Sequence, residues 1–416
     1  MAKGFNLDFT LRKDKAKLPE RPERETHITK RPDRVKQYLL HHMDDFVFDE
    51  FSTAYLEKLG MQDGLKGVPI PLRKGEDVAA FKSPEGLKTN IIAENMARVI
   101  GTDPKFKYSE QYQVFIFKLF GARATDILTR KAKDLADKEE YEMACIYFRA
   151  ALIIKYNDLP AMYGYARVLR TLYDNSTKED YIGNLKAESL DYFEMLTEIY
   201  PTFGSGWYYL GYMYLNLGLY MKAKIAWEYF LKKGRKTPAK DTKEIKQRLR
   251  QIEVPLEIEK GYNCVLSERW EDGIDILEKY KDSVYKDWWP LWYYLGVAYV
   301  KTKRTKEALS AFKHVLKENP RHIETMEEIV AIYSRQKDAE NVEKYNNKIR
   351  IMREAEEERR KTQEGDLSIK RARKDRGIEE KETPVIEFKK AASKIKRLDS
   401  KLKDVTEDID DGESDE

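Results

Sequence analysis

The sequence has few of the residues that build disulfide frameworks and metal centres. It holds two cysteines, Cys145 and Cys264, and five histidines in 416 residues. The cysteines form no CxxC pair and no metal-ligand spacing, which excludes a disulfide framework and a zinc module of standard type. We expect both thiols to behave as small apolar residues of a core.

Long apolar runs and a large charge of one sign are also missing. No run of about 18 apolar residues occurs, so we expect no transmembrane segment, and the first residues contain no apolar stretch of signal-peptide type. The 77 basic and 73 acidic residues leave a net charge of +4. This is too small for a global field that would attract nucleic acid or a membrane. We therefore expect a cytoplasmic protein.

Catalytic signatures are absent as well. There is no GxGxxG after a strand, no P-loop, no HExxH and no GxSxG motif. His41 and His42 stand beside Asp44 and Asp45, but their number and spacing fit no standard metal site, and a solvated group at the head of a helix explains them more simply. We predict no enzymatic activity, no metal and no cofactor.

What the sequence does contain is a repeated motif, WYYLG, at 207–211 and again at 292–296. Around the second copy, residues of fixed type recur at three- and four-residue intervals along two successive stretches, which predicts a helix–turn–helix unit of about 34 residues. These residues are Trp292, Leu295, Gly296, Tyr299, Ala308, Phe312, Val315 and Pro320. The unit resembles the tetratricopeptide repeat at each signature position of that family.

Weaker copies of the unit extend the pattern over residues 123–350, with about six units in all. Two segments interrupt the spacing, an insertion around 174–183 and a charged stretch at 238–253 that we interpret as an extra short helix. The resemblance implies an all-α fold, a helical-repeat solenoid in which each pair of helices packs on the next.

The flanks differ from the array in composition. Residues 1–36 are basic and predict an extended, disordered arm, and residues 37–122 predict an N-terminal helical domain with helices over 44–60, 88–101 and 108–120. Residues 351–416 form a charged tail with a heptad stripe over 388–409 and an acidic end. The stripe suits a coiled coil for self-association, a partner-binding helix or a basic membrane-surface helix, unless the run stays disordered.

The resemblance also implies where a ligand would bind. In this family, one stripe of each first helix lines the concave surface. The matching residues are Tyr163, Arg167, Arg170, Tyr208, Tyr212, Asn216, Tyr262 and Tyr293. Tyrosines offer apolar contact area and a hydroxyl to a peptide, while the arginines would select an acidic partner. The alternative, that these tyrosines pack against the protein's own helices, stays open at this point.

Two functions from different classes fit these features. We favour a non-enzymatic scaffold or adaptor that holds a protein or peptide partner in the concave groove. The alternative is a nucleic-acid-associated regulator that uses the N-terminal helices and the basic arm. Ala97 and Gly101 have the spacing of a helix–turn–helix motif within 91–115, and the arm would bind phosphates without sequence specificity. Thr102 stands where that motif usually has an apolar residue, and no helix rich in Arg, Gln or Asn follows. We therefore do not expect nucleic acid as a partner.

Overall fold

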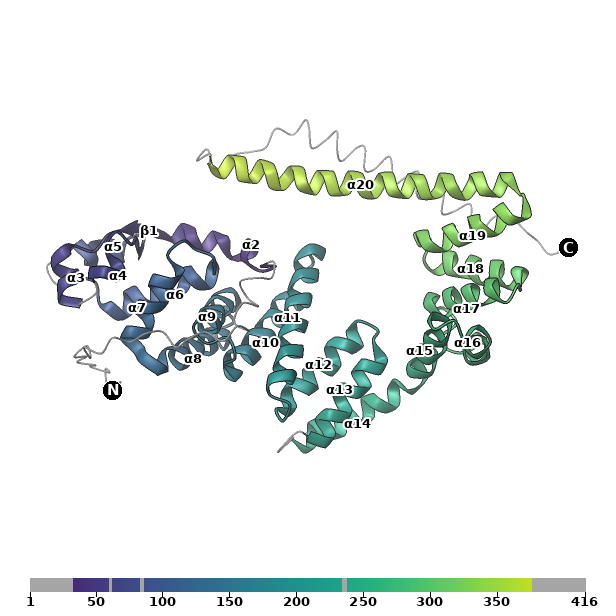
Figure 1. Cartoon of the computed structure of the whole chain (residues 1–416), viewed down its shortest axis with the longest axis horizontal. Helices are drawn as coiled ribbons and strands as arrows, with labels where there is room; N and C mark the ends of the chain where they lie inside the picture. Colours follow the sequence, from purple (N-terminus) through teal and green to yellow (C-terminus); the bar gives the residue numbers. More distant parts are fainter. Residues whose placement is uncertain (1–32, 60–61, 83–85, 234–237, 376–416) are drawn as a thin grey trace. The chain divides into compact units, whose positions relative to one another are not determined.

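The computed structural model describes residues 33–59, 62–82, 86–233 and 238–375. Over these residues the chain is almost entirely helical, as the sequence predicts, and most helices follow one another in packed pairs (Figure 1). The chain divides into two compact units, one that ends at Leu249 and one that begins at Arg250. In the described part of the chain, no helix combines the length and the apolar character that crossing a membrane requires.

The first unit opens with short elements that precede the repeats. They are α2 (Lys36–Leu39), the 3₁₀ helix η2 (Leu40–Asp45), β1 (Phe46–Asp49), α3 (Thr53–Leu59), α4 (Gln62–Leu65), β2 (Ile70–Arg73), α5 (Glu76–Lys82), α6 (Thr89–Thr102), α7 (Ser109–Phe120) and the 3₁₀ turn η3 (Gly121–Arg123). Helices α6 and α7 lie where the sequence predicts them. The helix predicted over 44–60 is wrong in its first half, because β1 pairs antiparallel with β2, with Val47 opposite Leu72.

The start of the described chain is packed rather than extended. Residues 33–36 fall within the arm that the sequence predicts, yet Val35 is buried and Arg34 pairs with Asp191 of a later helix at 2.6 Å. Asp33 binds the guanidinium of Arg149. The predicted boundary at residue 36 is therefore wrong for these four residues, since they contact side chains far along the sequence. Residues 1–32 lie outside the described part.

Six helical pairs follow in the described residues, three of them in the first unit. These three are α8 (Ala124–Ala136) with α9 (Tyr141–Ile154), α10 (Leu159–Asp174) with α11 (Glu179–Ile199), and α12 (Gly204–Asn216) with α13 (Tyr220–Lys233). Gly211 shows what a small residue in a first helix allows: a Cβ there would overlap the indole of Trp227 on α13. The insertion predicted around 174–183 lengthens α11 to 21 residues.

The charged stretch at 238–253 forms the extra helix that the sequence predicts. It is α14 (Ala239–Gln251), which follows α13 and precedes the next pair. Ile245 is its buried residue, and its remaining side chains are polar or half-exposed. Because it sits between two repeats, α14 is in a position to contact the face of α12.

Helix α6 packs against the first repeat and shares its core. Ala97 is fully buried, and a Cβ on Gly101 would overlap the backbone carbonyl of Ile146 on α9. The same Gly101 offers its carbonyl oxygen to Nε of Arg149 at 2.6 Å. The two small residues that suggest a helix–turn–helix motif in the sequence therefore allow close helix packing.

The second unit holds the other three pairs. They are α15 (Glu253–Leu266) with α16 (Trp270–Leu277) and its 3₁₀ extension η4 (Glu278–Tyr280), α17 (Trp289–Lys301) with α18 (Thr305–Glu318), and α19 (Ile323–Gln336) with α20 (Ala339–Asp375). Helix α20 packs through Tyr345, Ile349, Met352 and Ala355, which share one face. The start of the predicted tail at residue 351 is thus still part of the core, and the heptad stripe over 388–409 lies outside the described residues.

Candidate functional site: an arginine–tyrosine surface and an apolar cleft

Three of the predicted groove residues come together on α10, and a residue of α12 completes them. The guanidinium carbon of Arg167 lies 5.5 Å from the ring centroids of both Tyr163 and Tyr209, and that of Arg170 lies 5.6 Å from Tyr209. Each such cation–π contact is worth about 0.5–1 kcal/mol at an exposed site. We call Tyr163, Arg167, Arg170 and Tyr209 the arginine–tyrosine surface.

Tyr209 is the member of this surface that the sequence analysis missed. It follows Tyr208 in the WYYLG motif, and it turns toward the preceding repeat, where its ring stacks on Phe193 of α11 at 5.5 Å. Consecutive helical residues point about 100° apart, so Tyr209 cannot share the stripe of Tyr208. Asking which residues of the motif face the preceding helix pair would have identified Tyr209.

The two arginines differ in exposure and in whether their charge is paired with a carboxylate. Arg170 is half-buried and pairs with Asp174, one turn further along α10, at 3.5 Å. Arg167 is exposed and forms no ion pair among the residues that the structure describes. A guanidinium held against two aromatic rings keeps its N–H groups at the ring edges available to an outside acceptor.

The other predicted residues of α12 are engaged by the chain itself. The hydroxyls of Tyr208 and Tyr212 donate to the carboxylate of Glu244 on α14, and Arg248 of α14 lies over the ring of Tyr212 at 5.9 Å. Burial, together with the negative charges of its neighbours, raises the pKa of the Tyr208 hydroxyl. Both rings stay half-buried, and Asn216 is exposed at the end of α12.

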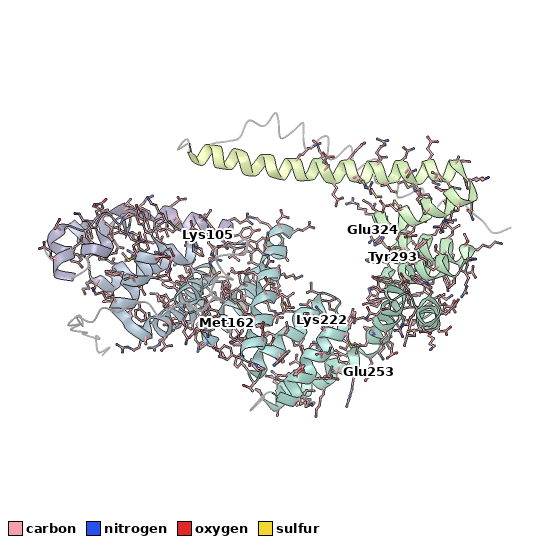
Figure 2. The ribbon with its side chains drawn as sticks, in the orientation of Figure 1. Lys105, Met162, Lys222, Glu253, Tyr293 and Glu324 are labelled. Carbon is pink, nitrogen blue, oxygen red and sulfur yellow. The ribbon has the colours of Figure 1, made fainter. Side chains whose placement is uncertain are left out.

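In the second unit, the predicted tyrosines belong to an aromatic group with acidic neighbours. Tyr262 of α15 stacks on Tyr294 at 4.8 Å, and Tyr293 of α17 lies 5.1 Å from His322, the residue that caps α19. Figure 2 labels Tyr293 and, on α19, Glu324. Burial and then the carboxylates of α19, Glu324 among them, raise the pKa of Tyr293. Burial lowers the pKa of His322, although Glu324 opposes it.

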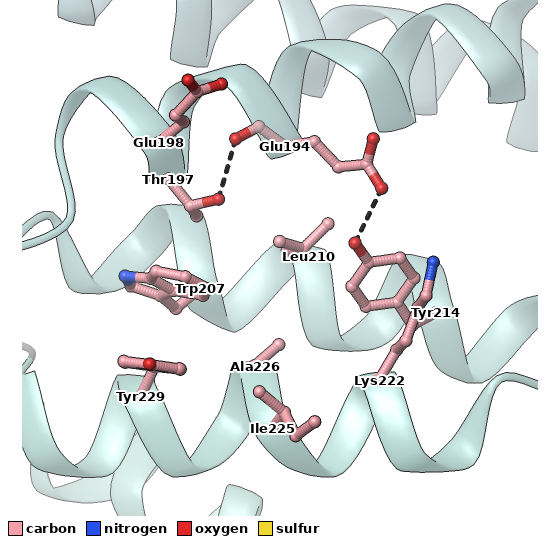
Figure 3. A pocket seen from close by; sticks show the side chains of 10 residues that line it. All are labelled: Glu194, Thr197, Glu198, Trp207, Leu210, Tyr214, Lys222, Ile225, Ala226 and Tyr229. Carbon is pink, nitrogen blue, oxygen red and sulfur yellow. Dashed lines mark hydrogen bonds between the residues drawn. The ribbon is translucent and has the colours of Figure 1, made fainter.

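An open cleft lies on another face of the first unit, between α11, α12 and α13 (Figure 3). Its volume is about 360 Å³. Apolar side chains of α12 and α13 form its floor, and Glu194 and Glu198 of α11 line one side. Trp207 is half-buried at the cleft, where its indole stacks on Tyr229 at 4.6 Å.

The polar groups of the cleft are mostly bonded within it. The hydroxyl of Tyr214 donates to Glu194 at 2.7 Å, and Lys222 lies over the ring of Tyr214 (Figure 3). Ile225 remains 45% exposed, which leaves apolar surface that an outside side chain could cover. The groups present are carboxylates, a lysine and aromatic rings, so the cleft offers contact area and no nucleophile–base pair.

Comparison with known proteins supports the repeat assignment. Two family models described as tetratricopeptide repeat match residues 289–322 and 192–225. The chain is a tetratricopeptide repeat protein. The first match covers α17 and α18 of this repeat protein, and the second runs from α11 into α13. No curated protein matches the chain.

Several solved structures of tetratricopeptide repeat proteins are similar to parts of it. The repeat domain of P58(IPK) is 16% identical, with 68% of this chain and 82% of that chain covered and a TM-score of 0.34. YrrB is 17% identical, with 56% and 97% covered and a TM-score of 0.25. TTC0263 of Thermus thermophilus is 19% identical, with 50% and 98% covered and a TM-score of 0.21.

Proposed function

We propose that this repeat protein is a non-enzymatic scaffold that binds an acidic segment of a partner protein on the arginine–tyrosine surface. Tetratricopeptide repeats are protein-interaction modules, and stacked repeats present extended surfaces for ligands. The observation that carries the proposal is Arg167, an exposed cation that rests on two tyrosine rings and has no ion pair in the described chain.

The chemistry of the surface defines the segment it would bind. The planar guanidinium of Arg167 matches a carboxylate through two parallel N–H···O bonds. Tyr163 and Tyr209 are half-buried, so their rings supply apolar contact area without much loss of side-chain entropy. A short stretch with Asp or Glu beside an apolar side chain would satisfy both parts.

For the nucleic-acid alternative, one of its two motivating observations has another explanation, while the basic arm at 1–32 lies outside the described residues. Ala97 and Gly101 serve the packing of α6 on α9, and the carbonyl of Gly101 is taken by Arg149. The heptad stripe at 388–409, for which self-association is one of the readings that the sequence leaves open, lies outside the described residues and stays a prediction. The scaffold function therefore rests on the arginine–tyrosine surface alone.

A capture experiment with charge-neutral variants tests the proposal. The native chain and Arg167→Gln/Arg170→Gln would be used to capture proteins from a nuclease-treated lysate, with Arg130→Gln/Lys133→Gln as the control. The control removes two exposed charges from α8, away from the arginine–tyrosine surface. We expect a partner that the native chain and the control retain and that the first variant loses.

Two further readouts make this result decisive. Thermal melting must show that all three proteins are folded. The retained partner should be released by raised salt, because the Debye length falls from about 10 Å at 0.1 M to about 3 Å at 1 M ionic strength, which screens an exposed charge pair. If the first variant captures the same partners as the native chain, the surface is not the binding site and the proposal fails.

A further inference from the structure

Two histidines of η2 and a glutamate of the first repeat meet at one point in the first unit. The Nε2 atoms of His41 and His42 each lie 3.2 Å from the same oxygen, Oε2 of Glu142, which belongs to the first turn of α9. The three ligand atoms lie within 4.8 Å of one another. We propose that His41, His42 and Glu142 form a binding site for Zn²⁺ that joins η2 to the first repeat.

The distances fit a tetrahedral metal ion. Zn²⁺ binds imidazole nitrogen and carboxylate oxygen at about 2.0–2.1 Å, so two ligands of a tetrahedral site stand about 3.3 Å apart. The two N···O separations of 3.2 Å are close to that edge, and they are also the length of a direct hydrogen bond, such as the one between His42 and Glu142. Two imidazoles and one carboxylate are also ligands that Zn²⁺ accepts, whereas Mg²⁺ and Ca²⁺ prefer oxygen alone.

A carboxylate lies near the second ring nitrogen of one of the ligands. Nδ1 of His42 lies 3.9 Å from Oδ2 of Asp45, and Arg98 holds that same carboxylate oxygen at 2.6 Å. In metal sites, the ring nitrogen that does not bind the metal usually donates to a carboxylate, which fixes the tautomer and the ring orientation. The contact between His42 and Asp45 is longer than a hydrogen bond, so the carboxylate would have to move closer to orient the ring in this way.

The exposure of the ligands sets what the site can do. The side chain of His42 is 17% exposed, that of Glu142 is 40% exposed and that of His41 is 59% exposed. A metal held by these three groups keeps its fourth position toward solvent, where a water would bind. The ion would connect segments 100 residues apart in the sequence, so its binding would stabilise the packing of the N-terminal elements on the array.

This site also explains why the sequence alone predicts no metal. That prediction considered only Asp44 and Asp45 as carboxylate partners of the histidine pair, because they are close in the sequence. The missing ligand, Glu142, comes from α9 and is brought to η2 by the fold. Spacing along the chain cannot reveal a ligand at such a distance.

The test is a titration of the full chain, expressed without a polyhistidine tag and stripped with a chelator, with Zn²⁺ alone against a competing chromophore. The variants are His41→Gln and Glu142→Gln, and Asp45→Asn tests the orienting carboxylate. The matched control is His314→Gln, which breaks the described chain's other candidate group, Asp287, His314 and Glu318.

We expect the native chain and His314→Gln to bind one Zn²⁺ with equal affinity at this site. Glu142→Gln and His41→Gln should weaken that binding at least tenfold, and Asp45→Asn by about 10–100-fold, as for other orienting partners. Co²⁺ in place of Zn²⁺ should give the strong visible absorption of a four-coordinate ion in the native chain and not in Glu142→Gln.

Thermal melting keeps the outcome clear if a variant is unstable. Zn²⁺ should raise the melting temperature of the native chain and of His314→Gln, and it should leave that of Glu142→Gln unchanged. The proposal is overturned if the native chain binds no Zn²⁺, if Glu142→Gln binds it as tightly as the native chain, or if only His314→Gln loses it.

Discussion

At the scale of single residues, Arg149 joins segments of the first unit that are far apart in the sequence. Its side chain is 6% exposed, and its guanidinium donates to Gly101 of α6, to both oxygens of Asp33 and to the hydroxyl of Tyr165. A buried charge is tolerated only when its partners replace water. Here they do so from several segments of the chain, which no local sequence pattern could have shown.

Replacing Asp33 by Asn should destabilise the protein and reduce its sensitivity to acid. Burial raises the pKa of Asp33, but Arg149 outweighs it, so the folded pKa lies below the ordinary value of 3.8. When folding lowers the pKa of a carboxyl group, the group contributes stability that is fully present above its pKa in the unfolded state. This stability is lost as the pH falls through its pKa in the folded state. Leaving Arg149 unpaired should cost about 3 kcal/mol at neutral pH.

Urea unfolding near pH 7, pH 5 and pH 3.5 would measure both effects. The native chain should lose more of its unfolding free energy between the two acidic conditions than Asp33→Asn does. Asp126→Asn, an exposed change on α8, is the control and should behave as the native chain. An equal loss on acidification in all three proteins would show that the Asp33–Arg149 pair does not contribute as argued.

At the scale of elements, regular helices follow from the sequence and short strands do not. In α17, Trp292, Leu295 and Gly296 lie at helical spacing, so the position of this helix in the sequence is predictable. Strands β1 and β2 have four residues each, and β2 contains Pro71. In the paired strands Ile70 and Leu72 are completely buried. This burial depends on tertiary contacts, which a pattern of four residues cannot predict.

The close approach of α6 to α9 can be tested at Gly101. In Gly101→Ala the new methyl group would overlap the carbonyl of Ile146, and such overpacking costs typically about 1–3 kcal/mol. The gain in helix propensity, about 1 kcal/mol, offsets part of it, so we expect a net loss of up to about 2 kcal/mol in denaturant unfolding.

Gly183→Ala provides the matched comparison. Gly183 is also helical, in α11, and nothing lies within 4 Å of a Cβ built on it. This variant should be as stable as the native chain or up to about 1 kcal/mol more stable. If Gly101→Ala were stabilised to the same extent, the contact between α6 and α9 would be looser than described.

At the scale of the whole molecule, the repeat array is predictable and its binding surface only in part. Helical geometry places Tyr163, Arg167 and Arg170 on one stripe, and the structure brings them together. The same geometry places Tyr208 and Tyr212 on a stripe that α14 then contacts through Glu244. The sequence predicts α14 as a helix but not the face on which it packs, because an insertion has no position in the repeat pattern.

Photo-crosslinking beside Arg167 would show whether a partner binds the arginine–tyrosine surface. A photoreactive residue at Thr171, one turn from Arg167 on α10, would be compared with one at Arg130 on α8, and the crosslinked peptides identified by mass spectrometry. We predict that position 171 forms adducts with an acidic segment of a partner. These adducts should disappear when Arg167→Gln is introduced into the same chain. A photoreactive residue at position 130 should not form them. Adducts that persist in Arg167→Gln, or none at position 171, would contradict the proposed function.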